Sequence, residues 1–298
     1  MGMKVFLTGA SGFVGCHLLT RLLKQGHHVI SYDIVPPIHQ DFLSTQICTI
    51  TGDLTSGDGL GQIEWENVDA VIHLAAAGVK ASKRIWSDCI SVNILGTEQL
   101  LNAISQASEQ PLLIYPKTLY EDYLSEIPSL ENNPYIVTKT SATKIVELWA
   151  KNTSNARVVF GTVFQTYGSG DDPRNVLPYT ASCLKNGVVA KLGSGKGLRD
   201  WIYINDLVDA FVRSLEVKGK NIQYFDFGTG KLTSIKEVVE TLAKLLGKPL
   251  SLLDFNHELD RGDINLKAKA TKFLPGWKPQ FSLGKGLPRF LDSLGQLS

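Results

Sequence analysis

Residues 3–15 read MKVFLTGASGFVG, and together with Asp33 they decide the fold. The run from 4 to 8 is short and apolar, as is typical of a buried strand. Gly9, Gly12 and Gly15 follow it, and residues 16–24 carry leucines at helical spacing. A strand, a glycine-rich turn and a helix in this order predict a site where backbone N–H groups at a helix N-terminus bind a pyrophosphate.

A second apolar run, from His28 to Tyr32, ends on Asp33, which comes about 20 residues after the turn. An acid in this place is expected to accept hydrogen bonds from the adenosine ribose hydroxyls of a dinucleotide. The same carboxylate would repel a phosphate on that ribose, and Tyr32 and Ile34 supply no cation to offset the repulsion. The sequence therefore favours NAD(H) as the cofactor over NADP(H).

The composition excludes several other classes of protein. The chain has 298 residues and a net charge of +1, which allows a large core but gives no basic surface for nucleic acid. Four scattered cysteines form no CxxC pair, which predicts reduced thiols and no metal site. No apolar run approaches the roughly 20 residues that a membrane span needs, and no signal peptide precedes the first strand. We therefore expect a cytoplasmic protein that binds neither nucleic acid nor membranes.

Strand and helix patterns alternate through the first half of the chain. Such alternation predicts an α/β fold, a Rossmann-type doubly wound parallel sheet with helices on both faces. After Gly168 the elements become shorter and mixed, although 201–204 and 224–227 still resemble buried strands. We expect an NAD-binding Rossmann domain over residues 1–164. Residues 165–298 are expected to form a smaller substrate-binding cap, partly interleaved with the Rossmann sheet.

Tyr135 and Lys139 are four residues apart, directly after Pro134, which is a favoured first residue of a helix. At that spacing both side chains share one helix face. An ammonium beside a phenol favours the phenolate and is therefore expected to lower the phenol pKa from about 10. Such a tyrosine can exchange a proton with a sugar hydroxyl while a hydride moves to or from nicotinamide. The pair is our predicted catalytic centre.

The chain resembles the extended short-chain dehydrogenase/reductases, also called the NAD-dependent epimerase/dehydratase family, over nearly its whole length. The motifs that carry the resemblance are TGASGFVG (8–15), Asp33, GDL (52–54), HLAA (73–76), VNILGT (92–97), PYIVTK (134–139), TYGSG (166–170), GLRDWIYINDL (197–207), FDFGTG (225–230), RGD (261–263) and GWKP (276–279). So many ordered matches are specific for the family, and much less so for the reaction.

The resemblance implies cofactor contacts beyond the glycine turn. It places Phe13 and Val14 over the pyrophosphate, Asp53 and Leu54 beside the adenine, Leu74, Ala75 and Ala76 along the cofactor groove, and Phe164 against the nicotinamide. Asn93 would support the active-site helix, and Lys139 would also bond the nicotinamide ribose. Lys80 resembles a lysine that some galactose epimerases place near the cofactor phosphates.

One departure from the family pattern concerns catalysis. The family carries Ser or Thr four residues before an aromatic residue, here Tyr120, to hydrogen-bond the reacting oxygen, but this chain has Pro116 there. Thr118 lies two residues further on and is our candidate replacement. Lys117 and Thr118 occupy the places of the Asp–Glu pair that dehydratases use, so a 4,6-dehydratase is not expected. Removing one such donor typically costs 10²- to 10³-fold in rate.

The resemblance also implies a nucleoside-diphosphate sugar as the substrate. Arg199 matches the family arginine that clamps the substrate diphosphate, and Asn175 matches the asparagine ahead of the capping helix in galactose epimerases. Gln165 stands where the family has Asn, and Arg261 is shifted one place from the usual arginine. Family members are often dimers through two helices, one of which corresponds to residues 135–151, and we expect a homodimer.

Three functions follow from these residues. The first is an NAD-dependent sugar-nucleotide epimerase that works by transient oxidation and re-reduction of the hexose C4. The second is an NAD(P)H-dependent 4-keto-6-deoxyhexose nucleotide reductase, similar to CDP-abequose synthase, although such reductases usually prefer NADPH and lack an acid like Asp33. The third is a catalytically weak NAD-sensing or scaffold protein, supported only by Pro116.

Overall fold

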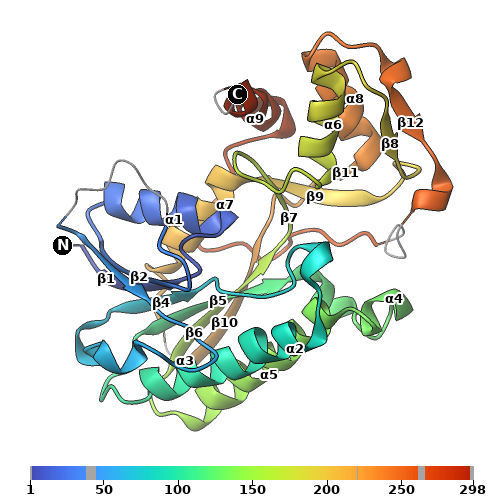
Figure 1. Ribbon diagram of the computed structural model, residues 1–298. Helices are drawn as coiled ribbons and strands as arrows, with labels where there is room; N and C mark the ends of the chain where they lie inside the picture. Colours follow the sequence, from blue (N-terminus) through green and yellow to red (C-terminus); the bar gives the residue numbers. More distant parts are fainter. Residues whose placement is uncertain (1, 38–44, 220, 261–265, 296–298) are drawn as a thin grey trace.

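The computed structural model describes residues 2–37, 45–219, 221–260 and 266–295. The glycine stretch forms β1 (Lys4–Thr8) and α1 (Phe13–Lys24), and β1 lies inside a parallel sheet of seven strands (Figure 1). The strand order is β10-β6-β5-β4-β1-β2-β3. The other strands are β2 (His28–Asp33), β3 (Ile47–Thr51), β4 (Ala70–His73), β5 (Leu112–Thr118), β6 (Arg157–Val163) and β10 (Asn221–Phe227). The doubly wound Rossmann-type sheet expected from the sequence is confirmed.

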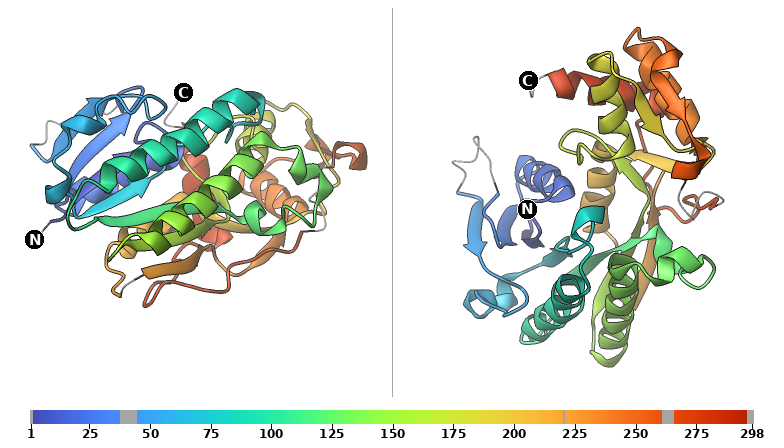
Figure 2. Two further views of the ribbon diagram at one scale, coloured as in Figure 1. Left: turned by 90° about the horizontal axis from the view of Figure 1, so that it is seen from below. Right: turned by 45° about the vertical axis from the view of Figure 1, so that its right-hand side comes forward.

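Both faces of this sheet are buried under helices. Val5 and Leu7 of β1 pack in the apolar cluster formed with α1 and α7 (Ile204–Ser214), while Phe6 packs in the opposite cluster. The helices α3 (Gly96–Ile104) and α5 (Pro134–Asn152) cover that second face (Figures 1 and 2). Because both faces are buried, β1 is an unbroken apolar run in the sequence. The strand order reverses between β1 and β4, the position where doubly wound folds bind ligands.

The second half of the chain contributes to the seven-stranded sheet and also forms a smaller sheet of its own. Strand β10 and helix α7 complete the Rossmann sheet, while three short strands form a separate sheet with the order β11-β9-β7 (Figure 1). The remaining elements of this half are β7 (Gln165–Tyr167), α6 (Val176–Lys185), β8 (Ala190–Leu192), β9 (Leu198–Tyr203), β11 (Leu232–Ser234), α8 (Ile235–Leu245), η6 (Leu250–Leu252), β12 (Leu253–Phe255), η7 (His257–Leu259) and α9 (Leu283–Gly295).

Helix α3 is the last part of a longer helical segment that is not regular along its length. It is preceded by α2 (Trp86–Cys89) and a π-helical segment, η4 (Ile90–Leu95), which continues directly into α3. A π segment, with hydrogen bonds from i to i+5, is rare, and residue periodicity alone does not predict it. Short helices elsewhere are η1 (Leu60–Gln62), η2 (Trp65–Asn67), η3 (Ala81–Lys83), η5 (Leu119–Tyr123) and α4 (Pro128–Glu131). None of the helices in the described ranges is both long enough and apolar enough to span a bilayer.

Candidate active site

The glycine turn brings backbone very close to backbone at the end of β1. Gly9 has a φ of 71°, and a Cβ atom there would lie 2.7 Å from the backbone nitrogen of Ala75. A Cβ atom on Gly15 would collide with the carbonyl oxygen of Gly9. Gly12 is the N-cap of α1 and offers no side chain to its first N–H groups. The turn therefore has the form of a pyrophosphate cradle at a helix N-terminus.

Asp33 ends β2 beside this turn. Its Oδ2 atom accepts hydrogen bonds from the backbone N–H of Ser11 at 2.9 Å and from the Ser11 hydroxyl at 2.6 Å. Its Oδ1 atom accepts from the backbone N–H of Ile34 at 2.8 Å. The carboxylate thus fixes the tip of the glycine turn, a structural role that its position in the sequence did not reveal.

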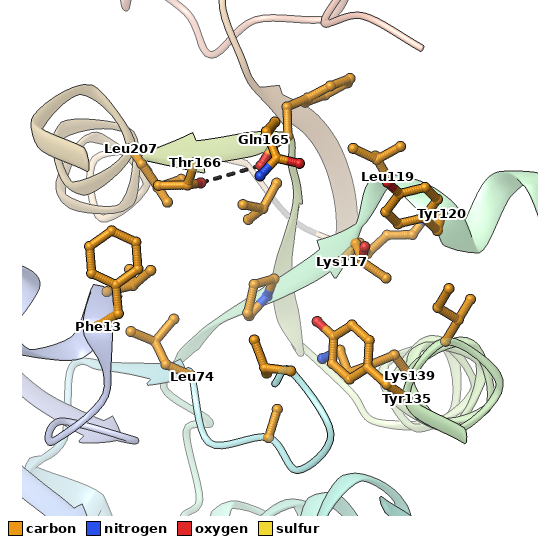
Figure 3. A pocket seen from close by; sticks show the side chains of 18 of the residues that line it. Phe13, Leu74, Lys117, Leu119, Tyr120, Tyr135, Lys139, Gln165, Thr166 and Leu207 are labelled. Carbon is orange, nitrogen blue, oxygen red and sulfur yellow. Dashed lines mark hydrogen bonds between the residues drawn. The ribbon is translucent and has the colours of Figure 1, made fainter. Parts of the chain in front are cut away.

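A cavity of about 530 Å³ opens at the carboxyl ends of the central strands, between the glycine turn and α5 (Figure 3). Of the predicted cofactor residues, Phe13, Val14, Leu74, Ala76, Tyr135, Lys139 and Phe164 lie in its wall. Ala75 is not among the described residues of this wall, and its backbone N–H donates to the hydroxyl of Thr8 at 3.1 Å. Leu54 is buried against Gly96, and Asp53 accepts hydrogen bonds from Thr55.

Tyr135 and Lys139 project into this cavity from the first turns of α5 (Figure 3). The start of the helix is fixed by Pro134 and by Asn133, whose side chain accepts from the backbone N–H of Tyr135 at 3.2 Å. Lys139 is only 5% exposed, and its Nζ atom lies 4.0 Å from the centroid of the Tyr115 ring. The phenol and the ammonium thus share one face of α5, as their spacing predicts.

The electrostatics of the pair differ from the expected picture in one respect. Burial raises the pKa of Tyr135, and the charge of Lys139 lowers it without outweighing burial. The expectation of a lowered phenol pKa is therefore wrong for the protein alone, because spacing gives the partner and not the depth of burial. Burial acts against the charged form of Lys139, but Tyr115, Glu121 and Tyr135 together raise its pKa. Lys139 is consequently an ammonium throughout the neutral range.

Asn93 connects the loop after β4 to α5. Its side-chain oxygen accepts from the backbone N–H of Ala77 at 2.8 Å, and its side-chain nitrogen donates to the carbonyl of Ala77 at 3.1 Å. The same nitrogen donates to the hydroxyl of Thr138 at 2.9 Å. Thr138 in turn donates to the carbonyl of Pro134 at 2.6 Å. Asn93 lies in η4, so the helix with the π segment is bonded to the first turn of α5.

His73, at the end of β4, holds together the strands beneath the cavity. Its Nδ1 atom lies 2.8 Å from the Thr8 hydroxyl, and its Nε2 atom lies 3.1 Å from the Thr97 hydroxyl. Because Thr97 donates to the carbonyl of Asn93, its oxygen is left to accept from Nε2–H, and the imidazole is neutral. Burial, followed by the charge of Lys139, lowers the pKa of His73 from 6.5 to about 3.

This buried neutral imidazole predicts acid-sensitive stability. Between pH 6.5 and about pH 3, His73 is protonated in the unfolded chain but not in the folded chain. The free energy of unfolding therefore decreases as the pH is lowered through this range. The loss is expected to approach about 1.4 kcal/mol per pH unit. Urea unfolding at several pH values should show this slope in the wild type and a smaller slope in His73→Gln. The exposed control His28→Gln should keep it, and an equal slope in both variants would contradict the assignment.

Thr118 and Pro116 both line the cavity. They are two residues apart on β5, so their side chains lie on the same face of that strand. The Thr118 hydroxyl accepts from the backbone N–H of Glu121, the N3 residue of η5, in a reciprocal capping box. An accepting hydroxyl keeps its own hydrogen for donation, so Thr118 can still serve as a donor toward the cavity.

The predicted substrate residues do not all meet at the cavity. Gln165 and Asn175 lie in its wall. Arg199 is 9% exposed on β9, where it donates to the carbonyl of Leu198, and it is not among the described residues that line the cavity. Lys80 is also outside the described wall and pairs with Asp172 at 3.6 Å. Arg261 lies outside the described residues.

Sequence reasoning missed two acids near the cavity. Asp171 lines it, and burial raises its pKa to about 6 despite the hydrogen bond from Asn175. Glu121 is buried beside α5, 7% exposed. The signal for Glu121 was present, because Thr at position 118 followed by Glu three residues later is the pattern of a capping box. Nothing local marks Asp171, since its burial comes from the fold.

Comparison with known proteins places the chain among sugar-nucleotide enzymes. It is 26% identical to UDP-glucose 4-epimerase of Mycolicibacterium smegmatis, over 97% of this chain and 98% of the relative. It is 26% identical to CDP-abequose synthase of Salmonella muenchen, over 97% of each chain. The solved structure of MoeE5 in complex with UDP-glucose and NAD superposes with a TM-score of 0.80 at 25% identity, covering 99% of this chain and 100% of that one. The model of the NAD dependent epimerase/dehydratase family matches residues 5–225, and the chain belongs to this family.

Proposed function

We propose that the chain is an NAD-dependent sugar-nucleotide epimerase that oxidises the hexose C4 transiently and reduces it again from the other face. The observation that carries this proposal is that one cavity is lined both by the Tyr135–Lys139 pair and by Phe13 and Val14, the first residues of α1 after the glycine turn. Phe13 stands at one side of the cavity and Tyr135 at the opposite side (Figure 3). A dinucleotide whose pyrophosphate lies at α1 can therefore extend toward the phenol.

The residues of the turn fit NAD. The Cβ-free Gly9 and Gly15 permit the close backbone approach, and the uncapped start of α1 offers N–H groups to a phosphate. Asp33 places a negative charge beside the turn, which supports NAD over NADP. When bound, NAD supplies the acceptor and then the donor of the C4 hydride.

The chain's own groups would move the proton. Tyr135 would accept the proton of the C4 hydroxyl through its phenolate oxygen and return it after the sugar has turned. Lys139 lowers the phenol pKa, and a positively charged nicotinamide ring would act in the same direction. Thr118 would donate its hydroxyl hydrogen to the same sugar oxygen, in place of the hydroxyl missing at Pro116.

A 4-ketoreductase is the second candidate function, favoured by the likeness to CDP-abequose synthase along nearly the whole chain. It would use the same Tyr135–Lys139 pair, with the phenol as proton donor to the keto oxygen, but it would consume reduced cofactor. The two functions thus differ in whether the cofactor is regenerated within one turnover.

One experiment separates these functions. The purified protein is assayed for bound nicotinamide, and then incubated with a panel of UDP-, dTDP-, CDP- and GDP-sugars while the absorbance of reduced nicotinamide is followed. We expect retained NAD, an isomerised product and no net change in absorbance. Stoichiometric oxidation of NAD(P)H by a 4-keto sugar would instead establish the reductase. Cofactor binding without either reaction would favour the sensing or scaffold protein.

The catalytic helix also has a surface suited to a second copy of the chain. Leu95 on η4 and Leu148 on α5 are 48% and 57% exposed, on helices that lie side by side. Two such faces packed together would bury these leucines, and the proposed assembly is a homodimer. Light scattering should give twice the chain mass, and a monomeric mass at micromolar concentration would contradict it.

A further inference from the structure

Glu121 is a buried acid that the mechanism above does not use. Its Oε1 atom accepts from the backbone N–H of Thr118 at 2.8 Å, and its Oε2 atom accepts from the hydroxyl of Thr143 at 2.7 Å. The first bond belongs to the cavity end of β5 and the second to α5. A single carboxylate therefore joins the segment that carries the candidate hydroxyl to the helix that carries the catalytic pair.

Thr143 lies on the same face of α5 as Tyr135 and Lys139, so the carboxylate bonded to it is on the side of the helix that carries this pair. Tyr135, Lys139 and Thr143 follow one another at intervals of four residues and so occupy one face of α5. The carboxylate is thus bonded to a residue one helical turn beyond Lys139. Both groups are almost completely buried, with 7% of Glu121 and 5% of Lys139 exposed. Their fields therefore act through protein and are little screened by water.

A buried carboxylate is retained only where other groups compensate its charge. Burial raises the pKa of Glu121, and Lys139, the two hydrogen bonds and Lys117 lower it without outweighing burial. In return the charge of Glu121 raises the pKa of both Tyr135 and Lys139. The other charged or titratable groups that act on this cluster are Tyr115 of β5, Arg84 of the loop after β4, and His73 of β4.

We propose that Glu121 is a positioning residue of the catalytic pair: its carboxylate ties the Thr118 segment to α5, and its charge sets the pH range in which Tyr135 and Lys139 work. The proposal rests on the proposed proton-transfer role of that pair. It assigns to Glu121 a function that the capping box alone would not require, since an amide in the same place could satisfy both hydrogen bonds.

The test is the pH dependence of kcat/KM in Glu121→Gln. The amide keeps the shape, accepts from Thr118 and donates to Thr143, and removes only the charge. Because that charge raises both pKa values, we expect both limbs of the profile to move to lower pH. The matched control Glu131→Gln removes an exposed charge from the end of α4 and should leave both limbs in place.

A second measurement keeps this inference separate from the identity of the reaction. The phenolate absorbance of the protein–NAD complex is titrated with base in the wild type, in Glu121→Gln and in Tyr135→Phe. Subtracting the Tyr135→Phe curve from the other two leaves the signal of Tyr135. We expect the Tyr135 signal to titrate at lower pH in Glu121→Gln, whether or not any sugar nucleotide turns over. A shifted titration without turnover would retain the inference and reject the epimerase. Unmoved limbs and an unmoved titration would overturn it, and Glu121→Met gives the same comparison should the glutamine variant not fold.

Discussion

Replacing Tyr135 by phenylalanine is expected to lower kcat by about 10²- to 10⁴-fold, the usual contribution of a positioned acid or base. Phenylalanine keeps the ring in the cavity wall and removes only the hydroxyl that would exchange the proton. The retained NAD and the melting temperature should therefore remain close to those of the wild type. The measurement is the rate at which a sugar nucleotide accepted by the wild type is converted, together with the nicotinamide content of the purified variant.

The matched control is Tyr179→Phe, on α6. Its hydroxyl accepts from the backbone N–H of Lys191 at 3.1 Å, so the substitution removes a hydroxyl bonded far from the predicted catalytic pair. This control should keep the wild-type kcat. If Tyr135→Phe kept it as well, the phenol would not be the proton-transfer group, and the sensing or scaffold function would gain support.

Substituting Gly15 by alanine is expected to abolish cofactor retention during purification. The added Cβ atom would meet the carbonyl oxygen of Gly9, which belongs to rigid backbone and cannot turn aside. Relieving such an overlap typically costs about 1–3 kcal/mol. If the turn opens to relieve it, the affinity for NAD falls by about 10- to 100-fold. Calorimetric titration of the cofactor-free protein with NAD measures this change directly.

Gly61→Ala is the matched control for this substitution. Gly61 lies in the short helix η1, and a Cβ atom there would meet no atom within 4 Å. The affinity of this control for NAD should equal that of the wild type. Unchanged affinity in Gly15→Ala would mean that the dinucleotide does not depend on the geometry of this turn, and the assignment of the cradle would be wrong.

The fold followed from features that are local in the sequence. An apolar run with no polar alternation predicts a strand buried on both faces, and β1 has that property because α1 and α7 cover one face while α3 and α5 cover the other. The start of α5 could likewise be predicted, since Pro134 and the preceding Asn133 are first-turn and cap residues. Such signals depend only on residues that are neighbours in the chain, so they can be recognised in the sequence without the three-dimensional structure.

Features that depend on depth and on distant partners could not be predicted. The spacing of Tyr135 and Lys139 gave their common face, but the rise in the phenol pKa comes from burial under segments remote in the sequence. Arg199 matched a motif and yet is not among the described residues of the cavity wall. On β9 it is almost completely buried and donates to the carbonyl of Leu198, a position that its motif does not predict. The capping-box pattern could have marked Glu121, but not its bond to Thr143, which lies 22 residues away.

The structure of this chain in complex with NAD tests the central claim most directly. We predict that the pyrophosphate lies at the start of α1 and that the nicotinamide ribose lies within hydrogen-bond reach of Tyr135 and Lys139. A dinucleotide bound elsewhere, or a Tyr135 hydroxyl directed away from the nicotinamide, would contradict the claim that this phenol exchanges the proton of a sugar hydroxyl.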